Sequence, residues 1–200
     1  MIPEPAKERL LCLMRLLERH DGPLITSTEA EALSGWSSHT IRKDISYLGG
    51  DCGGSPGGYV PASLIAAIQK ALGLERRRRL CVVGLGRLGS ALLNFSALES
   101  GEFELIAGFD TNVNRVEILK SPVPLYPAYK MPELIRRLAV EAALLCVPVG
   151  AAQGAAEKLA ESGIRGILNF APLALRLGPD IAVRNVSMID ELRALAIRLP

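Results

Sequence analysis

Residues 84–89, with glycines at positions 84, 86 and 89, constrain the fold of this 200-residue chain more than any other feature. They follow the apolar run 80–83 and lead into a helical pattern over residues 90–98, the context in which such glycines bind a dinucleotide. Gly84 permits a tight turn, Gly86 lets the backbone approach a pyrophosphate, and Gly89 lets a helix pack against the strand. N–H groups at the start of that helix suit the phosphates.

An acidic residue follows at the place this fingerprint requires. Asp110 ends the apolar run 105–109, about 20 residues beyond Gly89. A carboxylate there accepts hydrogen bonds from the adenosine ribose, and its charge disfavours a 2′-phosphate, so the pattern favours NAD(H) over NADP(H). The alternative is a glycine-rich turn and a surface aspartate in another kind of α/β domain.

Short apolar runs alternate with helical segments through the second half of the chain, at residues 80–83, 105–109, 143–147 and 166–168. This alternation predicts parallel strands joined by crossover helices. Neither histidine lies in this half, and its few lysines and tyrosines form no catalytic spacing, so the sequence favours a cofactor-binding domain over an enzyme.

Three helices are predicted near the N-terminus. The first spans residues 6–20. The second starts with the capping-box order of Thr28 and Glu31 and ends at Gly35. The third is capped by Ser37 or Ser38 and buries Ile41, Ile45 and Leu48 at i, i+4, i+7 spacing.

The third helix leaves Arg42, Lys43 and Ser46 on its outer face. Three helices in this order predict a helix-turn-helix, in which Arg42 can bond guanine in the major groove. The ten residues 49–58 contain six glycines and suit a flexible hairpin, the wing. The alternative is an ordinary small helical domain with solvated charges. The arginine run 76–79 suits either phosphate contacts or a solvated linker.

The predicted architecture is α/β, with a winged-helix DNA-binding domain (1–75), a Rossmann domain (76–185) and a terminal amphipathic helix (186–200). A helix is also predicted over residues 64–72.

The cysteines, the histidines and the lengths of the apolar runs narrow the class of protein. Four cysteines without a CxxC pair indicate free thiols in a reducing cytosol, and the two histidines have no ligand cluster around them, so we expect no metal. The N-terminus lacks a secretory pattern and no apolar run is long enough for a bilayer, so we expect a cytoplasmic protein with no membrane partner.

Four segments together resemble a known family over nearly the whole chain: residues 41–47, 83–92, 163–172 and 183–186. They are similar to the recognition helix, nucleotide loop and C-terminal motifs of the Rex redox-sensing repressors. The resemblance implies a homodimer whose terminal helices swap across to the partner. It further implies that NADH closes the dimer and releases an inverted-repeat operator, whereas NAD⁺ permits DNA binding.

Three positions depart from the family pattern. Phe95 stands where the family has tyrosine, and Ser187 stands where it has the aspartate that pairs with the arginine retained here as Arg15. A charged switch network therefore cannot form in the family's way, which predicts altered discrimination between NADH and NAD⁺. The wing carries Ser55 in place of an arginine, which predicts weaker operator binding. The alternative is drift with compensation elsewhere.

Two sets of candidate site residues result. The cofactor set is Gly84, Gly86, Arg87, Leu88, Gly89, Asp110, Val147, Pro148 and Asn169. The DNA set is Ser38, His39, Arg42, Lys43, Ser46, Tyr47, Ser55 and Gly58.

The leading hypothesis is a repressor that senses the NADH/NAD⁺ ratio. The rivals are a similar repressor with weakened or lost redox sensing, and a small NAD-dependent enzyme whose N-terminal helices serve only dimerisation.

Overall fold

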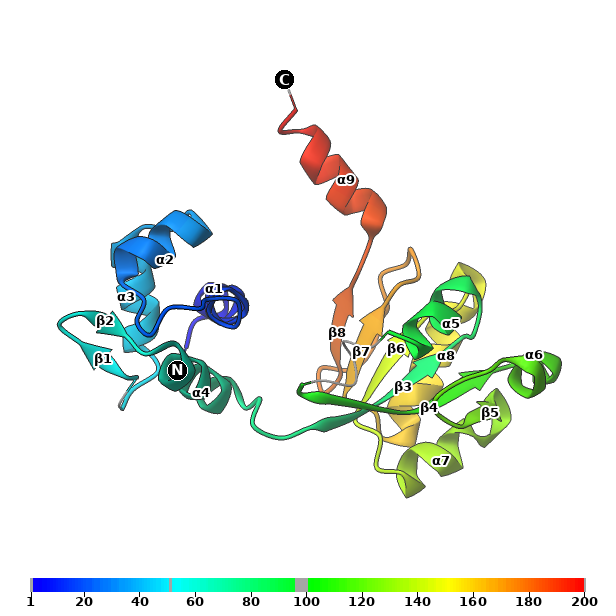
Figure 1. The fold of residues 1–200 in the computed structure, drawn as a ribbon. Coiled ribbons are helices and arrows are strands. Elements are labelled where there is room, and N and C mark those ends of the chain that lie inside the picture. The colour runs from blue at the N-terminus through cyan, green and yellow to red at the C-terminus, as the bar shows by residue number, and fades with distance from the viewer. Residues whose placement is uncertain (1, 51, 96–100, 200) are drawn as a thin grey trace. The chain divides into compact units, whose positions relative to one another are not determined.

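The computed structural model describes residues 2–50, 52–95 and 101–199 (Figure 1). The chain divides into two compact units, Met1–Arg76 and Arg77–Pro200. Asp51 of the predicted wing and the end of the predicted helix 90–98 lie outside the described residues.

The first unit is a winged helix. Its helices are α1 (Glu4–Leu17), α2 (Ser27–Ser34), α3 (Ser38–Ser46) and α4 (Pro61–Leu72), and its antiparallel hairpin is β1 (Gly54–Ser55) with β2 (Gly58–Tyr59). The helices are amphipathic and pool their apolar faces in one core. Fully or nearly fully buried there are Leu10, Leu17, Ile25, Ile41, Ile45, Leu64 and Ile68.

The capping box of α2 lies two residues earlier than predicted. Thr26, not Thr28, is the N-cap: its Oγ1 accepts from the Glu29 N–H at 3.1 Å, and Glu29 Oε2 accepts from the Thr26 N–H at 2.7 Å. Both positions fit the capping pattern. The bridge between Ile25 and Tyr59 keeps the chain extended up to Thr26, which decides the register.

Glu31, which was predicted to complete the capping box, has another role. Glu31 Oε2 accepts from the Ser38 N–H at 2.8 Å, which ties α2 to the start of α3. Ser37 caps α3 by accepting from the Thr40 N–H at 3.2 Å.

The second unit contains a six-stranded sheet in the order β5-β4-β3-β6-β7-β8, parallel throughout. This is the order of a doubly wound Rossmann sheet, with the crevice where connections diverge at β3 and β6. The strands are β3 (Arg78–Val83), β4 (Phe103–Asp110), β5 (Leu125–Pro127), β6 (Ala142–Leu145), β7 (Gly166–Asn169) and β8 (Ala182–Asn185).

Helices cover both faces of this sheet. Cys81 and Val83 of β3 face a core shared with α7 (Met131–Arg137) and α8 (Val149–Ser162). Leu80 and Val82 alternate to the other face, where α5 (Arg87–Leu93) and residues flanking and within α6 (Val113–Ile118) pack. Burial on both faces explains why the strands appear as continuous apolar runs. A short 3₁₀ turn, η2 (Ala128–Lys130), precedes α7.

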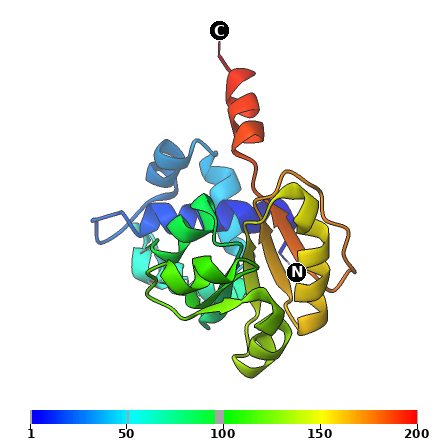
Figure 2. The same cartoon turned by 90° about the vertical axis from the view of Figure 1, so that its right-hand side faces the viewer.

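The terminal helix α9 (Met188–Ala196) continues from the edge strand β8, as Figure 2 shows from a second side. It is shorter than the predicted 186–200, and none of its residues is buried. Its exposed apolar side chains are Met188, Ile189, Leu192 and Leu195.

Candidate cofactor and DNA-binding sites

The glycine loop between β3 and α5 has the geometry that the fingerprint requires. Gly84 has φ +91°, and a Cβ there would meet the Cys146 carbonyl oxygen at 2.6 Å. A Cβ on Gly89 would lie 1.8 Å from the Gly84 oxygen, so only glycine lets α5 pack this closely. Gly86 differs, because a Cβ there would meet nothing within 4 Å. Its open side is the one that a pyrophosphate can approach.

Asp110 ends β4 beside this loop and is only 5% exposed. Its carboxylate accepts from the Leu85 N–H at 2.6 Å, the Asn112 N–H at 2.7 Å and the Arg115 guanidinium at 2.9 Å. A carboxylate offers about four lone-pair sites, so one remains for a ribose hydroxyl. Burial raises the pKa of Asp110, but these hydrogen bonds and the Arg115 charge outweigh it, and the pKa lies below its ordinary value.

The other predicted cofactor residues lie around the same edge. Arg87 and Leu88 are exposed at the start of α5. Val147 lies against Gly84, because a Cβ on Gly84 would be 2.8 Å from Val147 Cγ1. Pro148 is the N-cap of α8. The carboxyl ends of β3, β4 and β6 thus bring residues from three parts of the sequence to one edge of the sheet.

Asn169 lies at the predicted edge, at the end of β7, but its amide is fully buried and engaged inside the unit. Its Nδ2 shares two hydrogens among three acceptors, the Ala171 oxygen at 3.1 Å, the Leu173 oxygen at 2.8 Å and Asn185 Oδ1 at 2.9 Å, while its Oδ1 accepts from the Ala171 N–H at 3.0 Å. These bonds shape the loop after β7. The side chain cannot turn to a cofactor without losing them.

The thiol beside the glycine loop is unsuited to catalysis. Burial raises the pKa of Cys146 to about 12, so the thiol stays protonated at neutral pH. All four cysteines are free, with Cys81 buried and the others partly buried. In the part of the chain that the structure describes, no group of three metal-ligating side chains occurs. Among those residues, no helix is both long and apolar enough to cross a bilayer.

In the winged helix, α3 presents the predicted DNA-binding face. His39, Arg42, Lys43 and Ser46 are exposed, while Ile41 and Ile45 are buried. Arg42 donates to Ser27 Oγ at 2.7 Å, so its guanidinium is held near the first turn of α2. Ser46 donates to the Lys43 oxygen at 2.6 Å, Ser38 is partly buried, and Tyr47 is 37% exposed.

Asp44 is the position supporting the predicted DNA-binding face that the outer-face pattern missed. It is 3% exposed, and its carboxylate accepts from Arg9 Nε at 2.6 Å and Nη2 at 2.9 Å. This pair anchors the helix that carries Arg42 and Lys43 onto α1. The carboxylate and the hydrogen bond to it raise the pKa of Arg9. The available signal was an acid at an inward-facing helix position, which requires a partner.

The wing is fixed at its base. The Tyr59 N–H donates to the Ile25 oxygen at 2.8 Å and the Ile25 N–H donates back at 2.9 Å. A Cβ on Gly58, at φ +126°, would meet the Ile25 oxygen at 2.7 Å, so Gly58 is required for this close approach. Ser55, where an arginine was expected, donates to the Gly58 oxygen at 3.0 Å.

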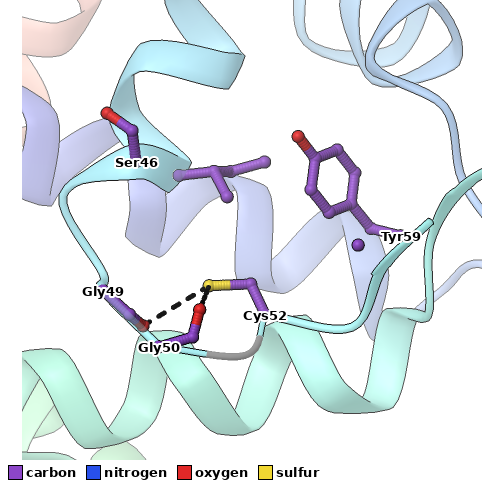
Figure 3. Close-up of a pocket in the computed structure, with 7 residues that line it drawn as sticks. Ser46, Gly49, Gly50, Cys52 and Tyr59 are labelled. Carbon is purple, nitrogen blue, oxygen red and sulfur yellow. Dashed lines mark hydrogen bonds between the residues drawn. The ribbon is translucent and has the colours of Figure 1, made fainter. Parts of the chain in front are cut away.

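A small hollow separates α3 from the wing (Figure 3). Ser46 and Tyr59 line it from opposite sides, and Cys52 lies at its floor with Sγ directed to the Gly49 and Gly50 carbonyls at 3.8 and 4.0 Å. The predicted hairpin is therefore tied to the rest of the unit at Tyr59, whereas the Cys52 contacts lie within the segment itself.

Three arginines of the run, at positions 77–79, make hydrogen bonds and an ion pair within the second unit. Arg77 donates to the Gly101 oxygen at 3.2 Å, Arg78 pairs with Glu141 at 3.3 Å, and Arg79 donates to the Leu138 oxygen at 2.8 Å. These contacts secure the start of β3. They support a structural role for residues 77–79 over a phosphate-binding one.

The family-model and sequence comparisons agree on the chain's relatives. A model described as a CoA binding domain matches residues 75–173. The redox-sensing transcriptional repressor Rex of Ligilactobacillus salivarius (strain UCC118) is 35% identical over 197 residues, covering 97% of this chain and 92% of that protein. Rex 1 of Enterococcus faecalis (strain ATCC 700802 / V583) is 34% identical over 198 residues, covering 98% of this chain and 91% of that protein.

Solved structures give the same result. RSP in complex with β-NAD⁺ and operator DNA superimposes with a TM-score of 0.90 at 29% identity, covering 99% of this chain and 92% of that one. RSP in complex with β-NADH gives a TM-score of 0.88 at 28% identity, covering 99% and 94%. RSP is described as a Rex-family repressor.

A winged helix with a basic recognition helix, followed by a Rossmann unit with an intact glycine loop, defines a nucleotide-binding transcription regulator. Both the predicted fold class and the resemblance are confirmed. The chain belongs to the Rex family of redox-sensing transcriptional repressors.

The departures from the family pattern at Phe95 and Ser187 lie at an exposed and a partly buried position. Phe95 is 55% exposed after α5. Ser187 is the N-cap of α9, where its Oγ accepts from the Asp190 N–H at 3.2 Å. Within the described residues, the exposed Arg15 has no ion-pair partner.

Proposed function

We propose that the chain is a homodimeric transcriptional repressor, not an enzyme, that binds an inverted-repeat operator and is released from it by NADH. The observation that carries the proposal is the presence, in one chain, of an exposed basic recognition helix and an intact glycine loop beside the buried Asp110. Binding of NAD⁺ and NADH by the related RSP supports NAD(H) as the cofactor.

DNA binding rests on α3 and the wing. His39, Arg42 and Lys43 face outward from a helix that Asp44 fixes to α1, an arrangement that suits insertion into a major groove. Arg42 would read bases, and Lys43 would neutralise phosphate. Ser55 at the wing supplies no charge for the minor groove, so we expect weaker operator binding than an arginine there would give.

The dimer rests on α9. Its exposed Ile189, Leu192 and Leu195 lie at helical spacing, and an apolar stripe of this kind is stable only when another surface covers it. We propose that a second copy of the chain covers it by exchange of α9, so that residues 186–200 form the dimerisation element. The same proposal places the protein in the cytoplasm, where its DNA and reduced thiols would be found.

A second candidate is a repressor of the same kind that binds its operator whatever the cofactor state. It is favoured by Phe95 and Ser187, which offer neither the hydroxyl nor the charge of the family's switch. NAD(H) would then be a structural ligand, because two cofactor forms can shift an equilibrium only if they bind the two states with different affinities.

Fluorescence anisotropy of a labelled A·T-rich inverted-repeat duplex separates these functions. The full chain is titrated without cofactor, with saturating NAD⁺ and with saturating NADH. Release by NADH alone establishes the redox sensor. Equal binding in all three conditions establishes the second candidate, and no binding in any of them contradicts both.

A further inference from the structure

The strand ends at the cofactor edge form one row across the sheet. Val83 of β3 is in register with Leu145 of β6, Leu145 with Asn169 of β7, and Asn169 with Asn185 of β8. Two strand spacings of about 4.8 Å separate β3 from β7. If Asp110 holds the adenosine half on the β4 side and the pyrophosphate lies at the glycine loop, the nicotinamide half would extend across the carboxyl ends of β6 and β7 toward β8.

A nicotinamide carries a carboxamide, which needs a hydrogen-bond donor for its oxygen. Asn169 lies in the right place but cannot supply one, because both its amide atoms are engaged inside the unit. Its full burial makes any rearrangement costly, since the Leu173 carbonyl would lose the donor that Asn169 supplies.

Asn185 has the opposite character. Its Oδ1 accepts from Asn169 Nδ2 at 2.9 Å, so the acceptor end of the Asn185 amide is held at β7. The side chain is exposed, and Nδ2 has no partner among the residues that the structure describes. An amide held at its oxygen, with an available donor, therefore stands at the β8 end of the row.

We propose that Asn185 is a specificity-determining residue that donates from Nδ2 to the carboxamide oxygen of the nicotinamide, with Asn169 as the positioning residue that orients it. The inference rests on the proposed function, because it requires a nicotinamide dinucleotide at the glycine loop. The carboxamide is common to NAD⁺ and NADH, so this contact sets affinity for both forms and does not by itself distinguish them.

The test compares NADH, NAD⁺ and ADP-ribose, which lacks the nicotinamide, by calorimetric titration of the full chain. In Asn185→Ala, the Kd of NADH and of NAD⁺ rises by the same factor, about 3- to 10-fold for one lost hydrogen bond, while that of ADP-ribose stays within about twofold. In Asn185→Asp, the acceptor for Asn169 is kept but a negative charge replaces the donor. NADH affinity then falls more than NAD⁺ affinity, because the oxidised ring is cationic.

Asp180→Ala is the matched control, because Asp180 is an exposed polar residue at the opposite, amino end of β8. It should leave all three ligands unchanged. An unchanged NADH affinity in Asn185→Ala, or an equal loss for ADP-ribose, overturns the inference and leaves the proposed function standing. If the unaltered chain binds neither NADH nor ADP-ribose, the proposed function is overturned and this inference with it.

Discussion

Arg9 binds Asp44 through two parallel hydrogen bonds, from Nε at 2.6 Å and from Nη2 at 2.9 Å, and so joins α1 to the recognition helix. Asp44→Ala leaves the guanidinium without its partner, and Arg9 is 29% exposed, so the cost is below that of a fully buried pair. We expect a loss of about 1–3 kcal/mol in the free energy of unfolding, measured by urea denaturation.

A double-mutant cycle tests whether the pair itself is responsible. Arg9→Ala combined with Asp44→Ala should cost less than the sum of the single changes, because neither charge is then left alone. Additive effects would contradict the coupling.

The glycine loop offers a matched pair of substitutions. Gly86→Ala should fold normally, because its Cβ meets nothing within 4 Å, yet lose NADH binding because the methyl group occupies the pyrophosphate's approach. Gly89→Ala should lower the melting temperature, since its Cβ would lie 1.8 Å from the Gly84 oxygen. Thermal melting and NADH fluorescence titration distinguish them. Retained NADH affinity in Gly86→Ala would place the pyrophosphate elsewhere.

Arg42 and Lys43 should fail in different ways when each is replaced by alanine. Arg42→Ala should lose preference for the operator over unrelated DNA by about 1–3 kcal/mol, the range for one bidentate base contact. Lys43→Ala should weaken binding to both DNAs alike and lower the salt slope by about one. Anisotropy titrations over a range of salt concentrations measure both. Equal losses of specificity in the two variants would contradict the assigned roles.

Acid should weaken the second unit through Asp110. Its hydrogen bonds outweigh burial and hold its pKa below the ordinary value, so the folded state favours the carboxylate. The stabilisation is therefore complete above the unfolded pKa, about 3.9, and is lost as the pH falls through the lower folded value. Melting curves of the full chain below about pH 5 should show this dependence. Asp110→Asn should reduce it, and an unchanged slope would assign it to other carboxylates.

Charge placed on α9 should separate the proposed dimer. Leu192 is 53% exposed in the single chain, and Leu192→Glu would bury a carboxylate if a second copy covers this face. We expect a monomer by sedimentation equilibrium and weaker binding to an inverted repeat, because two half-sites need two linked recognition helices. Arg193→Glu, on the charged side of α9, is the control. A Leu192→Glu dimer as tight as the original would exclude this face.

Local patterns predicted the parts of the fold that local chemistry determines. The glycines of the loop are required by backbone contacts within a few residues, and Ile41 and Ile45 repeat at helical spacing, so both appeared in the sequence. The capping register at Thr26 did not, because the bridge from Ile25 to the distant Tyr59 decides between two equal patterns. Strands β5 and β8 were missed, since three- and four-residue edge strands carry little periodicity.

Within the candidate site, long-range pairs were the unpredictable component. Asp110 follows the glycines at a fixed offset, whereas one of the bonds of Asn169 is to Asn185, which lies 16 residues further on at the end of β8. The same holds for Arg9 and Asp44, 35 positions apart. Sequence spacing indicates which residues reach an edge of the sheet or a face of a helix. It does not indicate which of them hydrogen-bond to one another there.

The Asn169 side chain also has a consequence for how the chain leaves the sheet. Its backbone oxygen accepts from the Val186 N–H at 2.8 Å, and its amide grips both Asn185 and the loop at Ala171. Asn169 thus links the loop after β7 to Asn185 and Val186, the residues that lead into α9. A displacement of the loop after β7 must therefore either break hydrogen bonds of Asn169 or move the residues that lead into α9.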